Sequence, residues 1–216
     1  MSLPKKYDER IRKNLGLRAV WLPGTNIKLG DVLWLKDGIF VPITNLRKLK
    51  VNFESEKLSD NISLKFQARG VSSSILQGGA KIKPINIDLK ADAELEIQFN
   101  REDTYFVRTP KITGYTITNI LTVAQNIIKI PDWNNKRNFI AWNVYKAGKF
   151  IFLGNEGGNA TVRVQGTGKA ILDFLKVGVS AKVARVTSSN TNIELIGERG
   201  PVAMRVIRVR KNGDIY

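Results

Sequence analysis

Apolar and polar residues alternate without interruption between Ile85 and Phe99. All the odd positions are apolar, and they are Ile85, Ile87, Leu89, Ala91, Ala93, Leu95, Ile97 and Phe99. All the even positions are polar, and four of them are acidic. Because side chains on a strand alternate between two faces, this pattern predicts one β-strand, roughly 50 Å long, with a fully apolar face. We expect the acidic face to meet water or basic neighbours.

Shorter stretches of alternation predict further strands, joined mainly as antiparallel hairpins. Residues 31–41 predict one such hairpin, because Asp37-Gly38 is a favoured turn pair between two apolar runs. The other expected strands cover residues 17–22, 62–68, 106–112, 139–145, 150–153, 160–165, 177–183, 191–196 and 202–209. The pattern has no repeat period and no linker, so it predicts a single domain over residues 1–216, either α+β or mainly β.

Two helices are expected beside these strands. Residues 7–15 form a short basic segment that Gly16 is well placed to end, and residues 116–129 carry apolar side chains at helical spacing before Pro131. Residues 69–80 are rich in Gly and Ser, and they predict a loop with Val71, Ile75 and Leu76 inside it.

The net charge of the chain indicates what kind of partner it binds. Lys and Arg number 35 against 19 Asp and Glu, and the net charge of +16 predicts attraction to nucleic acid or to an anionic membrane. Cations gather near both ends, at Lys5, Lys6, Arg10, Arg12, Lys13 and Arg18 and again at Arg205, Arg208, Arg210 and Lys211. Each cation near an anionic leaflet contributes about 1 kcal/mol, so such clusters suffice to hold a protein on lipid. No apolar run approaches the roughly twenty residues of a membrane-spanning helix, so a membrane role requires surface adsorption or β-strands.

Several kinds of chemistry are excluded by composition. The chain has no Cys and no His, which removes disulfides, thiol nucleophiles, His general bases and nearly every zinc site. Residues 166–169 lack the first glycine and the hydroxyl residue of a phosphate loop, so we interpret them as a turn. Glu94 and Glu96 could imitate a glycosidase pair, but a run of like charges on a solvated strand face explains them better. We therefore expect no enzyme and no cofactor.

The order of these pieces resembles a known family. A short N-terminal helix and Leu15-Gly16-Leu17 lead into residues 20–23, and a strand at 62–68 precedes the Gly-rich segment. The long alternating strand, an amphipathic helix near Ile117 and a final strand running into Asn212-Gly213 follow. In this order the chain resembles the pore-forming domain of bacterial gasdermins. The resemblance implies an α+β fold, with a twisted, mainly antiparallel sheet, long hairpins and a few helices packed on it.

The resemblance implies a membrane-binding protein that oligomerises into a β-barrel pore in anionic membranes and causes cell death in defence. The membrane-inserting strand would present Ile85, Ile87, Leu89, Leu95, Ile97 and Phe99 to lipid, and the hairpin tip would hold Val71, Ile75 and Leu76. Anionic-lipid contacts would come from Lys5, Lys6, Arg10, Arg12, Lys13, Arg205, Arg208 and Arg210. A second hairpin would join residues 160–165 to residues 177–183. Because barrel closure satisfies every backbone group, insertion would require oligomerisation.

The resemblance also implies partners and a location. The protein would be cytoplasmic when inactive and at the inner membrane when active. Its partners would be anionic lipids, further copies of itself and a separate inhibitor or activating protease. It would have no small-molecule substrate. No C-terminal inhibitory segment is evident after the last strand, and the Cys that bacterial gasdermins acylate is absent. The alternative is a basic nucleic-acid-binding or scaffold module, for which binding would depend steeply on salt.

Overall fold

The computed structural model describes residues 1–58, 62–134, 136–177, 185–189 and 193–216. Its helices are α1 (Leu3–Leu15), α2 (Ile120–Ile127), α3 (Gly168–Val177) and a short 3-10 helix, η1 (Pro84–Asn86). Its strands are β1 (Arg18–Ala19), β2 (Asp31–Lys36), β3 (Ile39–Asn45), β4 (Ser55–Lys57), β5 (Ile62–Gln67), β6 (Val71–Gln77), β7 (Ala80–Ile82), β8 (Asp92–Phe99), β9 (Thr104–Ile117), β10 (Phe139–Asn155), β11 (Ala160–Thr167), β12 (Arg185–Ser189) and β13 (Ile193–Ile207).

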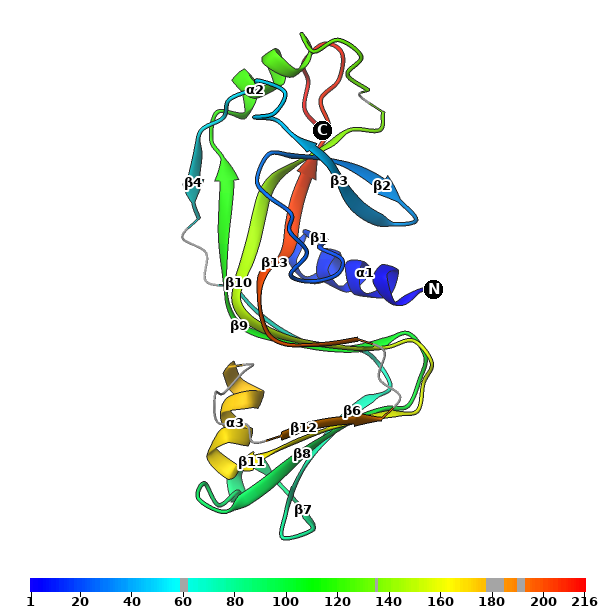
Figure 1. Cartoon of the computed structure of the whole chain (residues 1–216), viewed down its shortest axis with the longest axis vertical. Coiled ribbons are helices and arrows are strands. Elements are labelled where there is room, and N and C mark those ends of the chain that lie inside the picture. The colour runs from blue at the N-terminus through cyan, green and yellow to red at the C-terminus, as the bar shows by residue number, and fades with distance from the viewer. Residues whose placement is uncertain (59–61, 135, 178–184, 190–192) are drawn as a thin grey trace. The chain divides into compact units, whose positions relative to one another are not determined.

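The strands form two sheets, mainly by antiparallel pairing. One sheet has the order β1-β13-β10-β2-β3, with β9 paired to β10 and also to β4 and β5. The other has the order β12-β11-β8-β6-β7. Figure 1 shows β9, β10 and β13 running side by side. The prediction of an α+β fold with a mainly antiparallel sheet is confirmed.

The chain forms two compact units, each assembled from three separate stretches. Unit 1 comprises Met1–Lys6, Ile62–Lys111 and Gly148–Arg199, and unit 2 comprises Tyr7–Asn61, Ile112–Ala147 and Gly200–Tyr216. Because β9, β10 and β13 each continue from one unit into the other, neither unit corresponds to one continuous segment of chain.

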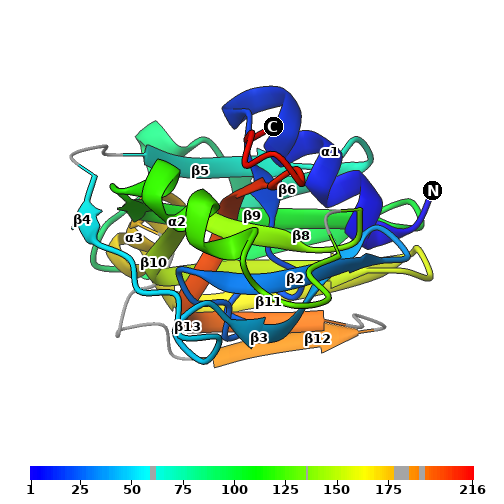
Figure 2. The same cartoon turned by 90° about the horizontal axis from the view of Figure 1, so that it is seen from above.

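The core of unit 1 is built around β8, which lies between β6 and β11 (Figure 2). Its odd residues, Ala93, Leu95, Ile97 and Phe99, are all buried in one apolar cluster. Helix α3 contributes Ile171 and Phe174 to the same cluster. The even residues face neighbouring polar side chains, because register places Glu96 opposite Arg163, whose Nη2 lies 3.0 Å from Oε2 of Glu96. The predicted two-residue period and the predicted basic neighbour are therefore both confirmed for β8.

The predicted length of this strand is wrong. Only residues 92–99 of the expected 85–99 form a strand, while residues 84–86 form η1 and residues 87–91 are in neither helix nor strand. Of the three predicted membrane-inserting residues in the missing part, Ile85 is 87% exposed, Leu89 is 51% exposed and Ile87 is buried.

The predicted loop at residues 69–80 is also corrected, because β6 occupies most of it. Val71 and Ile75 are buried against β8, where Ile75 pairs with Leu95. The predicted tip residues Val71, Ile75 and Leu76 thus lie within a strand, and the turn is formed by Gly78 and Gly79. Both glycines have positive φ, 57° and 80°, as a two-residue hairpin turn requires. The three serines of β6 suggested a loop, but serine is also tolerated at exposed positions of a strand.

Three further expectations change in detail. The strands expected at 139–145 and 150–153 are one strand, β10. The strand expected at 177–183 is not found at its start, where Val177 ends α3, and its remaining residues lie outside the described part of the chain. The expected turn at residues 166–169 is instead the junction of β11 and α3.

In unit 2, Asp8 joins α1 to β1. Its carboxylate accepts a hydrogen bond from the backbone N–H of Ala19 at 2.8 Å, and Nη2 of Arg18 lies 2.9 Å from its Oδ2. The neighbouring helix residues Tyr7 and Ile11 are fully buried. The basic helix therefore packs against the sheet through one apolar face and one nearly buried carboxylate.

We predict that Asp8→Ala lowers the free energy of unfolding by about 1–3 kcal/mol, because it leaves a buried N–H and a half-buried guanidinium without their acceptor. Urea denaturation followed by circular dichroism measures the change. Glu9→Ala is the matched control, since Glu9 is exposed on the same helix. An equal loss in both variants would contradict the role assigned to Asp8.

Candidate membrane-binding surface

Strands β2 and β3 form the hairpin that the sequence predicts, joined by Asp37 and Gly38. Both turn residues have positive φ, 54° and 86°, which matches the mirror-image turns favoured in hairpins. The pairing extends from Lys36 opposite Ile39 to Asp31 opposite Asn45, so the hairpin is longer than predicted.

The hairpin exposes large apolar side chains. Trp34, Leu35, Val41 and Ile43 are each between 42% and 45% exposed, although β2 and β3 are rich in apolar residues. Trp34 pairs directly with Val41, so the two side chains lie on the same face. We call Trp34, Leu35, Val41 and Ile43 the hairpin surface. Trp34 and Leu35 are adjacent and point to opposite faces of β2, and large apolar side chains exposed together on one hairpin mark a binding surface more often than scattered ones do.

Cations surround one side of the hairpin surface. A cavity of about 470 Å³ is lined by Trp34, Leu35, Phe139 and three exposed cations, Lys36, Lys136 and Arg137. The indole N–H of Trp34 donates a hydrogen bond to Oδ1 of Asn138 at 2.8 Å, which fixes the ring at the cavity wall. The site therefore combines an oriented tryptophan with positive charge, as membrane-interface sites do.

Aromatic rings bring cations from both ends of the chain to this hairpin. The Arg18 guanidinium lies 4.7 Å from the ring centre of Phe40, and that ring packs edge-on against Phe139 at 5.1 Å. The Arg208 guanidinium lies 5.0 Å from the Phe139 ring and 4.4 Å from the Tyr216 ring. The two basic clusters recognised in the sequence thus each contribute a cation next to β3 and β10.

The other predicted lipid-contacting cations differ in their exposure. Lys5, Arg10, Arg12 and Lys13 on α1 are exposed, and so is Arg205 on β13. Lys6 is engaged, because its Nζ lies 3.6 Å from Oδ2 of Asp103 and donates to the carbonyl of Glu102 at 3.2 Å. Arg210 lies over Tyr216 at 4.8 Å. Sequence reasoning missed Lys36, Lys136 and Arg137, although the consecutive apolar residues 32–35 beside Lys36 were a usable signal.

In unit 1, residues 87–91 are held in place by groups distant in sequence. The side chain of Gln77 accepts from the N–H of Asp88 at 2.9 Å and donates to its carbonyl at 3.0 Å. The first N–H groups of α3 also donate here, from Gly168 to the Ala91 carbonyl at 2.9 Å and from Lys169 to the Leu89 carbonyl at 3.1 Å. We call residues 87–91 the held segment. These four hydrogen bonds engage backbone groups of Asp88, Leu89 and Ala91 without strand pairing, and β8 begins directly after them, at Asp92.

Glycine at position 168 is required for this arrangement. A Cβ atom added to Gly168 would lie 2.0 Å from the carbonyl oxygen of Asp88, a separation that real atoms do not adopt. The start of α3 and the held segment therefore approach each other as closely as only glycine allows.

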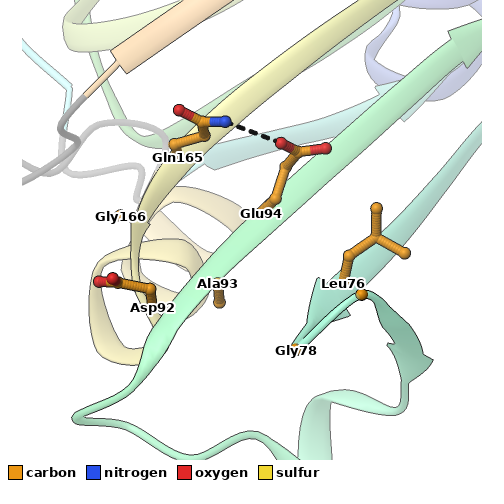
Figure 3. Close-up of a pocket in the computed structure, with 8 residues that line it drawn as sticks. Leu76, Gly78, Asp92, Ala93, Glu94, Gln165 and Gly166 are labelled. Atoms are coloured by element: carbon orange, nitrogen blue, oxygen red, sulfur yellow. Dashed lines mark hydrogen bonds between the residues drawn. The ribbon is translucent and has the colours of Figure 1, made fainter.

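A cavity of about 530 Å³ lies among β6, β8 and β11 (Figure 3). Glu94 borders it and accepts a hydrogen bond from Nε2 of Gln165 at 2.9 Å, and Asp92 lies two residues earlier on β8. Glu96 is ion-paired with Arg163, so the acidic residues considered as a glycosidase pair serve as cross-strand partners. Among the described residues, no group of three or more Asp or Glu side chains could hold a metal ion.

Arg108 is a half-buried cation that holds strands together. Its Nη1 donates to the carbonyl of Phe66 at 3.2 Å and to that of Val107 at 2.9 Å, while the guanidinium lies 4.2 Å from the Phe106 ring centre. Burial lowers the pKa of the Arg108 guanidinium below its ordinary value, because it penalises the charged form. Arg108 lies on β9, and its hydrogen bond to Phe66 links that strand to β5, so we interpret it as a structural cation.

Comparisons with known proteins add the following. No known family model matches the chain, and no curated protein is similar to it. The chain is similar to the cryo-EM structure of the gasdermin A3 membrane pore, with 10% identity, a TM-score of 0.41, and 97% of this chain and 90% of that chain covered. It is also similar to a bacterial gasdermin from Bradyrhizobium tropiciagri, with 16% identity, a TM-score of 0.41, and 97% and 89% covered. Both are gasdermins, the family that the sequence resembles. Among the described helices, none has the length and apolar character needed to cross a membrane.

We predict that Gly168→Ala loosens the held segment, because the new methyl group cannot coexist with the Asp88 carbonyl in its present position. Hydrogen exchange of the Asp88 and Lys90 amides should accelerate about tenfold, which corresponds to ~1.4 kcal/mol of local opening free energy.

Gly157→Ala is the matched control, since an added Cβ there would meet no atom within 4 Å and the change is the same. Unchanged exchange in Gly168→Ala would show that α3 does not restrain the held segment.

Proposed function

We propose that this protein binds anionic membranes through the hairpin surface and assembles there into a pore of gasdermin type. The observation that carries the proposal is the exposed set of Trp34, Leu35, Val41 and Ile43 beside Lys36, Lys136 and Arg137, on a chain of net charge +16. Apolar side chains enter the interface while cations attract anionic headgroups, and the two contributions add.

The proposed pore-forming segment is β8 extended back through the held segment. The alternation from Ile85 to Phe99 supplies more than the roughly nine to eleven residues that a membrane-spanning strand needs. Only its second half is paired in this structure, so the sequence is suited to a longer strand than the one present. The apolar residues Ile85, Ile87 and Leu89 would then join Leu95, Ile97 and Phe99 on the lipid-facing side.

The pairing partner follows from the existing register. β6 and β8 pair from Val71 opposite Phe99 to Leu76 opposite Glu94. Continued in the same register, this ladder would pair Gln77 with Ala93 and bring the chain round at residues 84–86. We therefore propose a tip at η1 in place of one at Val71, Ile75 and Leu76. Lys81 and Lys83 would lie close to that turn, where they can reach headgroups. Extension requires β7 to leave its present pairing with β6 and the held segment to leave α3.

The proposal implies a protein that is cytoplasmic until activated and then acts at the inner membrane, where pores cause cell death in defence. The protein would be activated either when a separate inhibitor is released or when a protease acts. Retention on DNA or RNA with a steep salt dependence, together with no binding to vesicles, would favour the alternative nucleic-acid-binding module.

We predict that Trp34→Ser/Leu35→Ser weakens binding to phosphatidylglycerol-containing vesicles about tenfold or more, because the loss of two interfacial side chains removes on the order of 2 kcal/mol of apolar burial. Co-sedimentation at moderate salt measures the binding. Leu121→Ser is the control, since Leu121 is 71% exposed on α2. Equal binding by the hairpin variant and the wild type would contradict the assigned surface.

We predict that Leu89→Asp keeps vesicle binding and abolishes dye release from the same vesicles. Leu89 is exposed in this structure, so the variant should fold. In the extended register it lies opposite Lys81, whose long side chain can reach the headgroups, whereas a short carboxylate on the lipid-facing side cannot and is therefore destabilising. Ile97 is fully buried, which makes it unsuitable for the same test. Leu121→Asp serves as the charge control. Dye release by Leu89→Asp at the wild-type rate would exclude insertion of the extended strand.

A further inference from the structure

A second cavity in unit 2, of about 460 Å³, is lined by cations from three parts of the chain. Lys28 precedes β2, Arg47 and Lys48 follow β3, and Lys146 lies on β10. The aromatic rings of Phe53 and Tyr115 form part of the wall, and none of the described lining residues is acidic. These residues are distinct from the hairpin surface and from the cations around it.

Aromatic rings position two of these cations without neutralising them. The guanidinium carbon of Arg47 lies 4.6 Å from the Phe53 ring centre, and Nζ of Lys146 lies 5.4 Å from the Tyr115 ring centre. The ion pairs found among the described residues involve Lys6, Arg18 and Arg163, and none involves the four cations of this cavity. Four like charges around one cavity repel one another, and a bound anion would relieve that repulsion.

The loop that carries the cations is held by a fixed network. Asp31 is buried, and its Oδ2 accepts from the N–H of Lys28 at 2.7 Å while its Oδ1 accepts from Nδ2 of Asn45 at 2.8 Å. Oδ1 of Asn45 accepts in turn from the N–H of Arg47 at 3.0 Å. The backbones of Lys28 and Arg47 are thus both hydrogen-bonded to the Asp31–Asn45 pair. The Asp31 carboxylate accepts from a backbone N–H and from the Asn45 amide, and not from the charged groups of the four cations. The site is therefore preorganised for a ligand.

The wall formed by Phe53 depends on glycine. A Cβ added to Gly30, which has a φ of 77°, would lie 2.4 Å from an atom of the Phe53 ring. The ring therefore packs against bare backbone and stays beside Arg47. This close packing distinguishes the cavity from a loose cluster of surface lysines.

We propose that this cavity, which we call the anion pocket, binds a small molecule or headgroup that carries two or more phosphomonoester groups. Arg47 can bind phosphate oxygens through two N–H groups, while Lys28, Lys48 and Lys146 act as point charges around it. A volume of about 460 Å³ lies in the range of small-molecule sites and exceeds the needs of a single phosphate. The polar and aromatic walls would contact the carbon skeleton between the phosphates.

Isothermal titration of the full chain with inositol hexakisphosphate, pyrophosphate and inorganic phosphate at constant ionic strength tests the pocket. We expect saturable binding of one inositol hexakisphosphate per chain, with inorganic phosphate weaker by about tenfold or more. Arg47→Met/Lys146→Met should weaken the inositol phosphate by about tenfold or more. Lys81→Met/Lys83→Met is the matched control, since it removes the same charge from exposed positions of unit 1 and should change binding less than about twofold.

Equal weakening in the two double variants, or absence of saturable binding by the wild type, would overturn the proposal. Melting curves with and without inositol hexakisphosphate give a second measurement, because the ligand should raise the Tm of the wild type more than that of a folded pocket variant. If Arg47→Met/Lys146→Met does not fold, Lys48→Met replaces it, since Lys48 is exposed and should fold normally.

Vesicles distinguish a lipid headgroup from a free ligand. The pocket variant is compared with wild type on phosphatidylinositol 4,5-bisphosphate vesicles and on phosphatidylserine vesicles of matched charge. Weaker binding to the first vesicles alone, together with weaker binding of the soluble probe, assigns a lipid headgroup, while a loss confined to the soluble probe assigns a free ligand. If the pocket variant binds both the phosphatidylinositol 4,5-bisphosphate vesicles and the soluble probe as tightly as the wild type does, the proposal is overturned. Trp34→Ser/Leu35→Ser should leave the soluble titration unchanged, so failure of the hairpin surface and failure of the anion pocket are separable.

Discussion

The hydrogen bonds that hold residues 87–91 decide which structure this chain adopts in unit 1. Gln77 and the start of α3 together occupy backbone groups of Asp88, Leu89 and Ala91. Each such bond contributes about 0.5–1.5 kcal/mol, so four of them rival the strand pairing that they replace. The alternating sequence would satisfy the same groups in a longer ladder. Under the proposed function, two arrangements compete for one stretch of backbone, and the contacts of Gln77 and Gly168 favour the compact one.

This competition explains how far the sequence could predict the fold. Local periodicity placed β8 and its buried face correctly, because Leu95, Ile97 and Phe99 pack on the same side whatever ends the strand. It could not place the strand's beginning, because Gly168 lies about eighty residues away in sequence. The Asp37-Gly38 turn was predictable from local chemistry, whereas the exposure of Trp34 depends on how elements distant in sequence pack around the hairpin. The anion pocket combines residues that lie far apart in the sequence, so local patterns could not predict it.

The positive charge of the protein is organised in two physically different ways. Arg18 and Arg163 lie against carboxylates, and their charge is largely compensated within the fold. Arg47, Lys146 and Arg208 lie over aromatic rings, which orient a cation and leave its charge available. The net charge of +16 is therefore not spread evenly over the surface. Some of the cations are held by rings beside a cavity, and cations oriented in this way are suited to binding an anion.

Strand extension and self-association are linked by the order of the five-stranded sheet. β8 is covered by β11 on one side and β6 on the other, and β7 is the outermost strand beyond β6. If β7 became the continuation of β6 in a longer hairpin, the outer side of that hairpin would lose its present partner. Unpaired backbone groups are costly in water and far more so in lipid, so the new edge requires another strand. A second copy of the same hairpin is the partner of matching length. On this physical ground, leaving the compact arrangement and joining another chain are one coupled step, which a membrane surface favours by concentrating the chains.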